Sequence, residues 1–394
     1  MQFSDIKKQE QQNMMPAYAR FDIAIVEGNG VVAKDSEGKT YLDFTSGIGV
    51  NALGFCDASW IEAITKQASA LQHVSNLYYQ PVQTALAQRL CELSGFSKVF
   101  FGNSGAEANE CAIKLARKYS TDQYGKKRNK IITLVNSFHG RTVTTLSATG
   151  QDSFHQYFYP FTEGFVYAQA NDIKSVESFV GDETCAVLIE MIQGEGGVMP
   201  LDMQFVRELE ALCQKHDILL IVDEVQTGMG RTGTLFCYEQ YGIHPDVITL
   251  SKALGGGLPI GACLCTERLG TVLSSGMHGS TFGGNPIACA GALSILERVA
   301  DSDFLKQVAE KGVYIQRKIA DMEDVAEVRG MGMMIGIVLK NGTAKDVAVK
   351  CLEKGLLVLT AKTLIRLLPP LTITYEEIDR GLTILADVIK EVQA

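Results

Sequence analysis

Lys252 and Asp223 are the two residues whose types and positions point most directly to chemistry. Each follows a short, mostly apolar segment, residues 245–251 for the lysine and 218–222 for the aspartate. Ligands bind at the carboxyl ends of strands in open α/β sheets, so we expect both side chains at a ligand site. An amine there can form a Schiff base with the aldehyde of pyridoxal phosphate, and a carboxylate can keep the pyridine nitrogen protonated. A solvated lysine at a strand end is the simpler alternative, and Asp223 argues against it.

Composition and charge narrow the classes of protein to consider. Hydrophobic residues make up 46% and charged residues 21% of the 394 residues, which is ordinary for a globular protein. The net charge of −9 argues against nucleic acid or an anionic membrane as a partner. No apolar stretch approaches membrane-spanning length, and the polar segment 1–9 lacks the apolar centre of a signal peptide. We therefore expect a cytoplasmic protein.

The ten cysteines follow no pattern of spacings. Cys263 and Cys265 would share one face of a strand, but no second pair and no nearby histidine completes a metal site. We interpret the cysteines as reduced thiols in the core of a cytosolic protein, and we expect no metal.

The middle of the sequence repeats a short apolar run, a turn and an amphipathic stretch. Strands that are apolar throughout and alternate with helices indicate a mainly parallel sheet covered on both faces. We predict a large α/β domain over residues 51–290. Its expected strands include residues 99–101, 131–134, 186–189 and 218–222, and its expected helices are 106–119 and 204–216.

Residues 291–394 follow a different pattern, which predicts a smaller α+β domain. Residues 30–44 alternate apolar and polar side chains around a hairpin turn at Glu37 and Gly38, so we expect segment 1–50 to pack with this small domain. The expected C-terminal strands are 325–329 and 333–339, and the expected helices are 344–354 and 375–392.

Two glycine-rich segments have a composition that is typical of phosphate-binding loops. Residues 102–109 lie between a predicted strand and a predicted helix, where free N–H groups and a serine hydroxyl can bind phosphate. A tight strand-to-helix turn explains this segment equally well. Residues 228–233 match a dinucleotide fingerprint, but those glycines should directly follow a strand and begin a long helix. Residues 223–227 intervene and Pro245 leaves little room, so we set the nicotinamide hypothesis aside.

Residues 136–142 follow a predicted strand and combine an aromatic ring with a cation. Phe138 could lie on a planar cofactor, and Arg141 could bind a carboxylate in bidentate fashion. Core packing of Phe138 and a surface position for Arg141 are the alternatives. His139 is as consistent with a structural role as with a catalytic one.

Further glycine-rich turns carry polar side chains. Residues 190–197 place two acids in a loop that can approach a ligand closely, although a solvated loop would have a similar composition. Residues 280–286 offer two hydroxyl groups in another such turn. Arg366 stands immediately before a rigid turn that contains Pro369 and Pro370.

Together these segments resemble the class III pyridoxal-phosphate aminotransferases, which have the fold type I scaffold. The similarity covers essentially the whole chain, and the motifs occur in the family's order. Segments 223–228 and 251–253 form the most specific pair. The resemblance implies pyridoxal 5′-phosphate as the cofactor, a large domain with a mainly parallel sheet of the seven-stranded type, and a homodimer with shared active sites.

The resemblance also implies a role for individual residues. Lys252 would hold the cofactor and then move the proton between substrate and cofactor, and Asp223 would pair with the pyridinium nitrogen. Val225 and Phe138 would cover the two faces of the ring, and Gln226 would approach the ring hydroxyl. The cofactor-binding set also includes Glu224, the backbone of Gly105 and Ala106 at the phosphate, and Thr281 of the partner subunit.

Within the family, the chain is most similar to the branch that transfers the δ-amino group of N2-acetyl-L-ornithine to 2-oxoglutarate in arginine biosynthesis. Segments 47–51, 138–141 and 366–371 fit that branch. The ornithine branch has a tyrosine near the position of Gly47, and a glycine there would leave room for an acylated amino group.

The two substrates of that reaction place their carboxylates differently. The resemblance implies that Arg141, with Ser280 nearby, binds the distant carboxylate of acetylornithine. Arg366 would bind the carboxylate of glutamate or 2-oxoglutarate next to the cofactor. Glu195 would neutralise Arg366 in the first half-reaction and swing away in the second, because an unpaired guanidinium in a partly desolvated pocket is costly.

Several rival functions stay open from the sequence. Ornithine, 4-aminobutyrate or succinyl-diaminopimelate could be the amine donor, and the same scaffold supports aminomutases and decarboxylases. Glu195 together with Arg366 favours transamination to a dicarboxylate acceptor. The non-enzymatic alternative is a ligand-binding regulator, which no DNA-binding motif or basic region supports.

Overall fold

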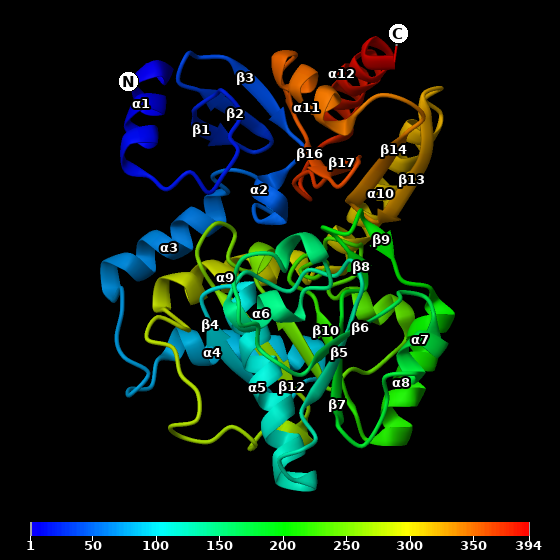
Figure 1. Cartoon of the computed structure of the whole chain (residues 1–394). Helices are drawn as coiled ribbons and strands as arrows, with labels where there is room; N and C mark the ends of the chain where they lie inside the picture. Colours follow the sequence, from blue (N-terminus) through cyan, green and yellow to red (C-terminus); the bar gives the residue numbers. More distant parts are fainter. Residues whose placement is uncertain (1, 394) are drawn as a thin grey trace.

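The larger part of the protein is built on one seven-stranded sheet, in the lower half of Figure 1. The computed structural model describes residues 2–393. The strands are β4 (Lys98–Gly102), β5 (Lys130–Leu134), β6 (Phe165–Ala168), β7 (Thr184–Ile189), β10 (Leu219–Asp223), β11 (Val247–Leu250) and β12 (Gly261–Cys265). Their order is β4-β12-β11-β10-β7-β5-β6. Neighbours from β11 to β6 are parallel, and β12 is antiparallel to both of its neighbours. The predicted mainly parallel α/β sheet is confirmed.

Both faces of this sheet are covered by helices. α5 (Gly105–Tyr124) packs on β4, β12 and β11 and contributes to one apolar core. The opposite face belongs to a second and larger core, to which α4 (Pro81–Ser94), α8 (Met203–His216) and α9 (Pro286–Val299) contribute. Successive side chains of a strand point to opposite faces. Along β10, Leu219 and Ile221 join the core under α5, whereas Leu220 and Val222 join the other one.

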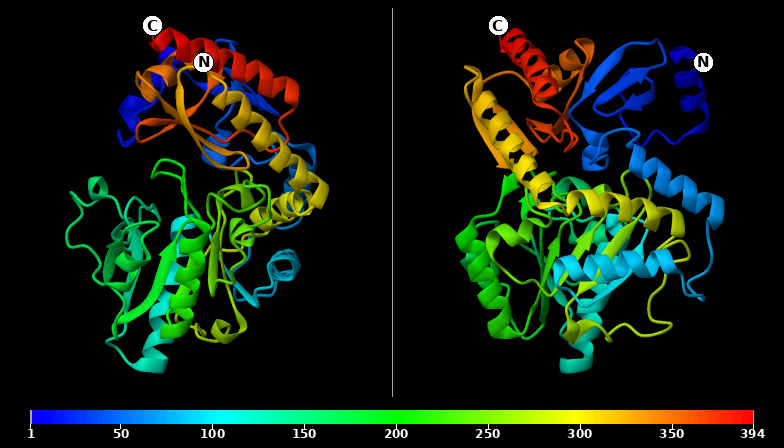
Figure 2. Two further views of the ribbon diagram at one scale, coloured as in Figure 1. Left: turned by 90° about the vertical axis from the view of Figure 1, so that its right-hand side faces the viewer. Right: turned by 180° about the vertical axis from the view of Figure 1, so that it is seen from behind.

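A smaller part lies above this sheet and combines both ends of the chain (Figures 1 and 2). One of its four-stranded sheets has the order β1-β2-β3-β15, and the other has the order β13-β14-β17-β16. These strands are β1 (Ile25–Asn29), β2 (Val32–Asp35), β3 (Thr40–Asp43), β13 (Val325–Met331), β14 (Met334–Leu339), β15 (Leu356–Leu357), β16 (Leu359–Ala361) and β17 (Leu364–Leu367). The helices of this part include α10 (Ser302–Ala320), α11 (Ala344–Glu353) and α12 (Tyr375–Gln393).

The N-terminal segment is joined to the C-terminal part by pairing and by packing. β3 and β15 are parallel neighbours, with Leu42 opposite Leu356. The buried ring of Phe44 lies so close to α12 that a Cβ at Gly381 would be 2.2 Å from the ring carbon Cζ. These contacts support the predicted packing of segment 1–50. The predicted limit at residue 290 falls within α9, so we propose that the small domain begins after this helix, at α10.

The remaining elements are short or connect the two parts. Residues 228–233 lie in turns, and the next helical segment is the 3-10 helix Cys237–Tyr241, so a dinucleotide-binding helix is absent there. All ten cysteines are free thiols, and all but Cys56 and Cys91 are buried. No helix within residues 2–393 is long and apolar enough to cross a bilayer. The other elements are α1 (Phe3–Asn13), α2 (Ser46–Gly49), α3 (Ala58–Ala70), α6 (Val143–Ala148), α7 (Ile173–Glu177), β8 (Ile192–Gln193), β9 (Met199–Pro200) and the 3-10 helices Asp152–Phe154, Lys252–Leu254 and Glu267–Leu269.

Candidate active site

The carboxyl ends of parallel strands bring the chemically competent residues to one edge of the large sheet. Asp223 is the last residue of β10, and Lys252 follows β11 after one residue. Glu190 follows β7, and the turn that carries Phe138 follows β5. Because these strands are neighbours in the sheet, segments far apart in sequence meet at the same edge.

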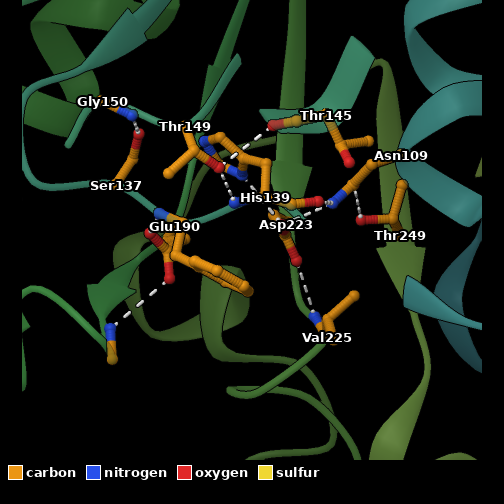
Figure 3. Close-up of polar contacts among 12 residues, drawn as sticks. Asn109, Ser137, His139, Thr145, Thr149, Gly150, Glu190, Asp223, Val225 and Thr249 are labelled. Atoms are coloured by element: carbon orange, nitrogen blue, oxygen red, sulfur yellow. Dashed lines mark hydrogen bonds and ion pairs between the residues drawn. The ribbon is translucent and has the colours of Figure 1, made fainter. Parts of the chain in front are cut away.

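Asp223 is a buried carboxylate held by three hydrogen-bond donors from three segments (Figure 3). Its Oδ2 atom lies 2.9 Å from Nδ1 of His139 and 2.8 Å from Nδ2 of Asn109. Its Oδ1 atom accepts the backbone N–H of Val225 at 3.0 Å. By the alternation of β10, this side chain points toward α5, which is the helix that carries Asn109.

Lys252 combines a strained backbone with a desolvated amine. Its φ of +40° lies in a region that residues other than glycine seldom occupy, and such conformations cluster at functional sites. Burial lowers the pKa of the Lys252 amine, and Arg366 acts in the same direction. Glu195, Asp223 and Glu190 oppose this shift without reversing it. A lowered amine pKa favours the unprotonated form, which is the nucleophile that a carbonyl group requires.

The N-terminus of α5 fits a phosphate group. Gly105 and Ala106 are its first two residues, so their N–H groups have no acceptor within the helix. Ser104 caps the helix by accepting the N–H of Glu107 at 3.1 Å. A Cβ at Gly105 would lie 2.7 Å from Cγ1 of Val225, so only glycine allows the helix to begin this close to the side chain predicted to cover the ring.

Phe138 and Arg141 form an aromatic and cationic layer at the entrance to this edge. The Phe138 N–H donates to Oε2 of Glu190 at 2.9 Å. Phe154 meets the Phe138 ring edge-on at 5.8 Å between centroids, and the Arg141 guanidinium lies 4.2 Å from Phe154 and 5.5 Å from Phe138. Arg141 is exposed and has no ion-pair or hydrogen-bond partner in the described part of the chain, so its donors are available to a carboxylate.

Arg366 and Glu195 form an asymmetric ion pair, with 2.6 Å between Nη1 and Oε1. The Arg366 side chain is only 3% exposed, whereas that of Glu195 is 32% exposed. Nη1 of Arg366 also donates to Oε1 of Gln226 at 3.2 Å, and its Nε is buried without a partner among residues 2–393. The arginine is therefore fixed, and the glutamate is the partner that has room to move.

The remaining predicted residues are Glu224, Ser280 and Thr281. The Glu224 carboxylate accepts the Thr227 hydroxyl and the N–H of Tyr238, so it fastens the chain that follows β10. Ser280 accepts a hydrogen bond from Nδ2 of Asn103 at 2.9 Å, which places it beside the start of α5. Thr281 is exposed to solvent in the single chain. The cofactor and substrate roles of all the predicted residues stay predictions.

Sequence inspection assigned no role to Asn109, indicated Glu190 only as one of two acids in a glycine-rich loop, and left His139 undecided. Asn109 lies on the buried face of α5, among Ala108, Cys111 and Ala112. A buried amide on an otherwise apolar helix face was the signal that could have indicated it, since buried polar groups require partners. Glu190 is buried, and desolvation together with the nearby Asp223 charge raises its pKa well above the ordinary value.

Comparisons with known proteins agree on one family. The family model for class III aminotransferases matches residues 14–389. The acetylornithine aminotransferase of Haemophilus ducreyi is 48% identical over 99% of this chain and 100% of its own length. That of Caldanaerobacter subterraneus is 48% identical over 98% of this chain and 99% of its own. The ornithine aminotransferase structure from Toxoplasma gondii has a TM-score of 0.95 at 31% identity, covering 100% of this chain and 96% of its own. The acetylornithine aminotransferase structure from Elizabethkingia anophelis has a TM-score of 0.89 at 33% identity, with coverages of 99% and 100%.

Glu224→Gln tests whether this carboxyl is structural or belongs to the cofactor site. Burial raises the pKa of Glu224 to about 7 from an ordinary 4.5, so the folded protein keeps a proton that the unfolded chain releases between these pH values. The free energy of unfolding of the wild type should therefore fall, relative to the variant, as pH rises from 4.5 to 7, by up to about 1.4 kcal/mol per pH unit. Urea unfolding at several pH values measures this difference. If the free energies of unfolding of the wild type and the variant change with pH in the same way, the pKa of Glu224 is not raised. If the variant binds the cofactor more than about tenfold more weakly, Glu224 belongs to the cofactor site.

Proposed function

The chain belongs to the class III aminotransferases, and from that premise we propose that it transfers the δ-amino group of N2-acetyl-L-ornithine to 2-oxoglutarate. The products are N-acetylglutamate 5-semialdehyde and glutamate, so the reaction belongs to arginine biosynthesis. The observation that carries this proposal is the pair of unlike arginines: Arg141 is exposed and has no ion-pair partner among residues 2–393, whereas Arg366 is buried and paired with Glu195. The curated acetylornithine aminotransferases that match at 46–48% identity over nearly the full length support it.

The enzyme uses pyridoxal 5′-phosphate, which when bound supplies an aldehyde that takes up an amino group and a ring that accepts electrons. The proposal assigns the covalent attachment to Nζ of Lys252, which also moves the proton at the reacting carbon. Asp223 holds the proton on the ring nitrogen, while Val225 and Phe138 cover the ring faces. The N–H groups of Gly105 and Ala106 bind the phosphate.

The arginines separate two substrates that bind in different orientations. Acetylornithine reacts through its δ-amino group, so its carboxylate lies far from the reacting carbon and binds Arg141. During that half-reaction Glu195 neutralises Arg366, because leaving a buried charge without its partner costs about 3–5 kcal/mol. The α-carboxylate of 2-oxoglutarate replaces Glu195 on Arg366 in the second half-reaction, and the partly exposed glutamate has room to withdraw.

Ornithine is the second candidate donor, because the Toxoplasma gondii ornithine aminotransferase is similar over almost its whole length at a TM-score of 0.95. The surroundings of Gly47 favour the acylated donor instead. Gly47 is exposed with a φ of +60°, and a Cβ there would meet only Nδ2 of Asn51, at 3.5 Å. This open space is compatible with an acyl group on the α-nitrogen.

A homodimer with shared sites is part of the proposal. Nδ2 of Asn76 donates to the backbone oxygens of Ser280 and Gly283, which joins two loops into one surface. This surface presents large exposed apolar side chains beside Thr281, of the kind that a partner subunit covers. They are Leu77, Tyr78, Tyr79 and Phe282. We also place the enzyme in the cytoplasm, since a reducing compartment maintains its ten free thiols.

A steady-state comparison of four amines tests the substrate. We expect kcat/KM for acetylornithine to exceed that for ornithine, 4-aminobutyrate and succinyl-diaminopimelate by about tenfold or more, which is about 1.4 kcal/mol. Lys252→Ala serves as the blank and should lose nearly all turnover, because its amine both holds the cofactor and moves the proton. A faster reaction with another amine would contradict the substrate, and wild-type turnover in the variant would contradict the role of Lys252.

Lys252→Ala also tests whether each active site is shared between two subunits. In a heterodimer of Lys252→Ala and Thr281→Ala chains, one of the two sites combines an intact lysine with an intact threonine. Mixing the two dissociated variants should therefore restore part of the activity that each lacks at limiting cofactor. No recovery despite chain exchange, or a single-chain mass in sedimentation, would count against the dimer.

Glu195→Ala tests the switch on Arg366. Without Glu195, Arg366 should stay free for an α-carboxylate, so the single-turnover rate with glutamate should rise relative to that with acetylornithine by about tenfold, or about 1.4 kcal/mol. Glu195→Gln keeps a hydrogen-bond acceptor of the same size without the charge, and should shift the ratio in the same direction.

The alternative for Glu195 is that it only stabilises its loop. Both single-turnover rates would then fall together, or neither would change. A constant ratio of the two rates in both variants would rule out the switch, even if the overall activity were lower.

A further inference from the structure

The hydrogen bonds around Asp223 use all but one of its acceptor positions. A carboxylate offers about four lone-pair sites, two on each oxygen. His139 and Asn109 occupy the two on Oδ2, and the N–H of Val225 occupies one on Oδ1 (Figure 3). Asp223 is 5% exposed, so water has little access to the remaining site. One acceptor position on Oδ1 is left open.

The orientation of the Asn109 amide is fixed by its neighbours. Nδ2 lies 2.8 Å from the backbone oxygen of His139, and a carbonyl oxygen can only accept a hydrogen bond. The group facing it must therefore be the NH2, which also faces Asp223 at 2.8 Å. The Thr249 hydroxyl donates to Oδ1 of Asn109 at 2.7 Å, which is compatible with this orientation. Both hydrogens of the amide are thus committed, one of them to Asp223.

His139 is positioned in the same way. Its backbone N–H donates to Oγ1 of Thr149 at 3.0 Å, which fixes the turn that carries it. Its Nδ1 faces Asp223, while its Nε2 is buried without a partner among residues 2–393. A carboxylate oxygen can only accept, so the Nδ1 that faces it carries a proton and His139 donates to Asp223.

We propose that His139 and Asn109 are positioning residues for the cofactor ring: together they hold Asp223 as a carboxylate whose only open acceptor position, on Oδ1, receives the N–H of the pyridine ring. This inference rests on the proposed pairing of Asp223 with that nitrogen. Donors placed before the reaction cost no reorganisation during it, and hydrogen bonds to a charged acceptor are about twice as strong as neutral ones. The two residues contact neither substrate nor cofactor in this role.

Substitutions matched in shape separate positioning from packing. His139→Leu and Asn109→Leu remove the donors but fill similar space, whereas His139→Asn keeps an N–H group at the position of Nδ1. Ser137→Ala is the control, because Ser137 lies in the same turn as His139, while its hydroxyl accepts the N–H of Gly150 and does not contact Asp223. Thermal unfolding shows whether each variant is folded. If His139→Leu does not fold, Asn109→Leu and His139→Asn carry the test.

Two readouts distinguish this proposal from a structural role. The first is the 15N chemical shift of bound cofactor labelled at the ring nitrogen, which reports the protonation of that atom. The second is the single-turnover reaction with acetylornithine, resolved into the maximal rate and the apparent Kd of the amine. We expect both leucine variants to move the shift toward the neutral ring and to lower the maximal rate about 10- to 100-fold. The Kd of the amine should change less than about threefold, because Arg141 binds it.

His139→Asn and Ser137→Ala should keep the wild-type shift and a rate within about threefold of the wild type. The proposal is overturned if the leucine variants keep the wild-type shift and rate, or if folded His139→Asn behaves like His139→Leu. Asp223→Asn, measured in the same series, tests the pairing of Asp223 with the ring nitrogen separately from the positioning role of His139 and Asn109. If it also keeps the wild-type shift and rate, the proposed pairing of Asp223 fails. If it alone loses both, only the positioning role of His139 and Asn109 fails.

Discussion

The carboxyl group of Asp223, buried and surrounded by hydrogen-bond donors, is the feature on which the rest of this structure depends. Removing Asp223 from water is unfavourable unless its oxygens find other donors, and α5, the turn after β10 and the turn after β5 each supply one. Two of the three donors, His139 and Asn109, are far from Asp223 in sequence, and the fold of the sheet and of α5 brings them to it. The alternation of β10 decides that the aspartate points toward α5, while its neighbour Val222 packs in the opposite core. The large sheet and α5 therefore bring these donors together around Asp223.

The buried positive charge of Arg366 is neutralised in a different way from the charge of Asp223. The side-chain partners of Asp223, His139 and Asn109, are themselves buried, and further hydrogen bonds hold both residues in place. Arg366 is equally buried, but its ionic partner Glu195 is a third exposed on a glycine-rich loop. A fixed carboxylate suits a cofactor that stays in place, and a replaceable counter-charge suits substrates that alternate. The third charge is Arg141, which lies over the rings of Phe138 and Phe154 and has no ionic partner in the part of the chain that the structure describes.

Sequence reasoning located the groups whose positions depend on local structure. Asp223 and Lys252 follow apolar runs, so their placement at strand ends required no knowledge of the tertiary fold. The parallel sheet followed from the same runs, because strands buried on both faces have no polar alternation. Asn109 was missed because its partner is more than a hundred residues away in sequence, and only the packing of α5 on the sheet brings them together. Glu224 is adjacent to Asp223 but points to the other side of the chain, where it meets Thr227 and Tyr238. Thr281 depends on a second chain, which no single-chain pattern can place.

The most direct measurement is the structure of the enzyme with pyridoxal 5′-phosphate bound, solved finely enough to place the ring nitrogen. The account predicts that this nitrogen lies about 2.7–3.2 Å from Oδ1 of Asp223. It also predicts that His139 and Asn109 remain on Oδ2. A ring nitrogen that faces another group, or that displaces His139 from Oδ2, would contradict the account.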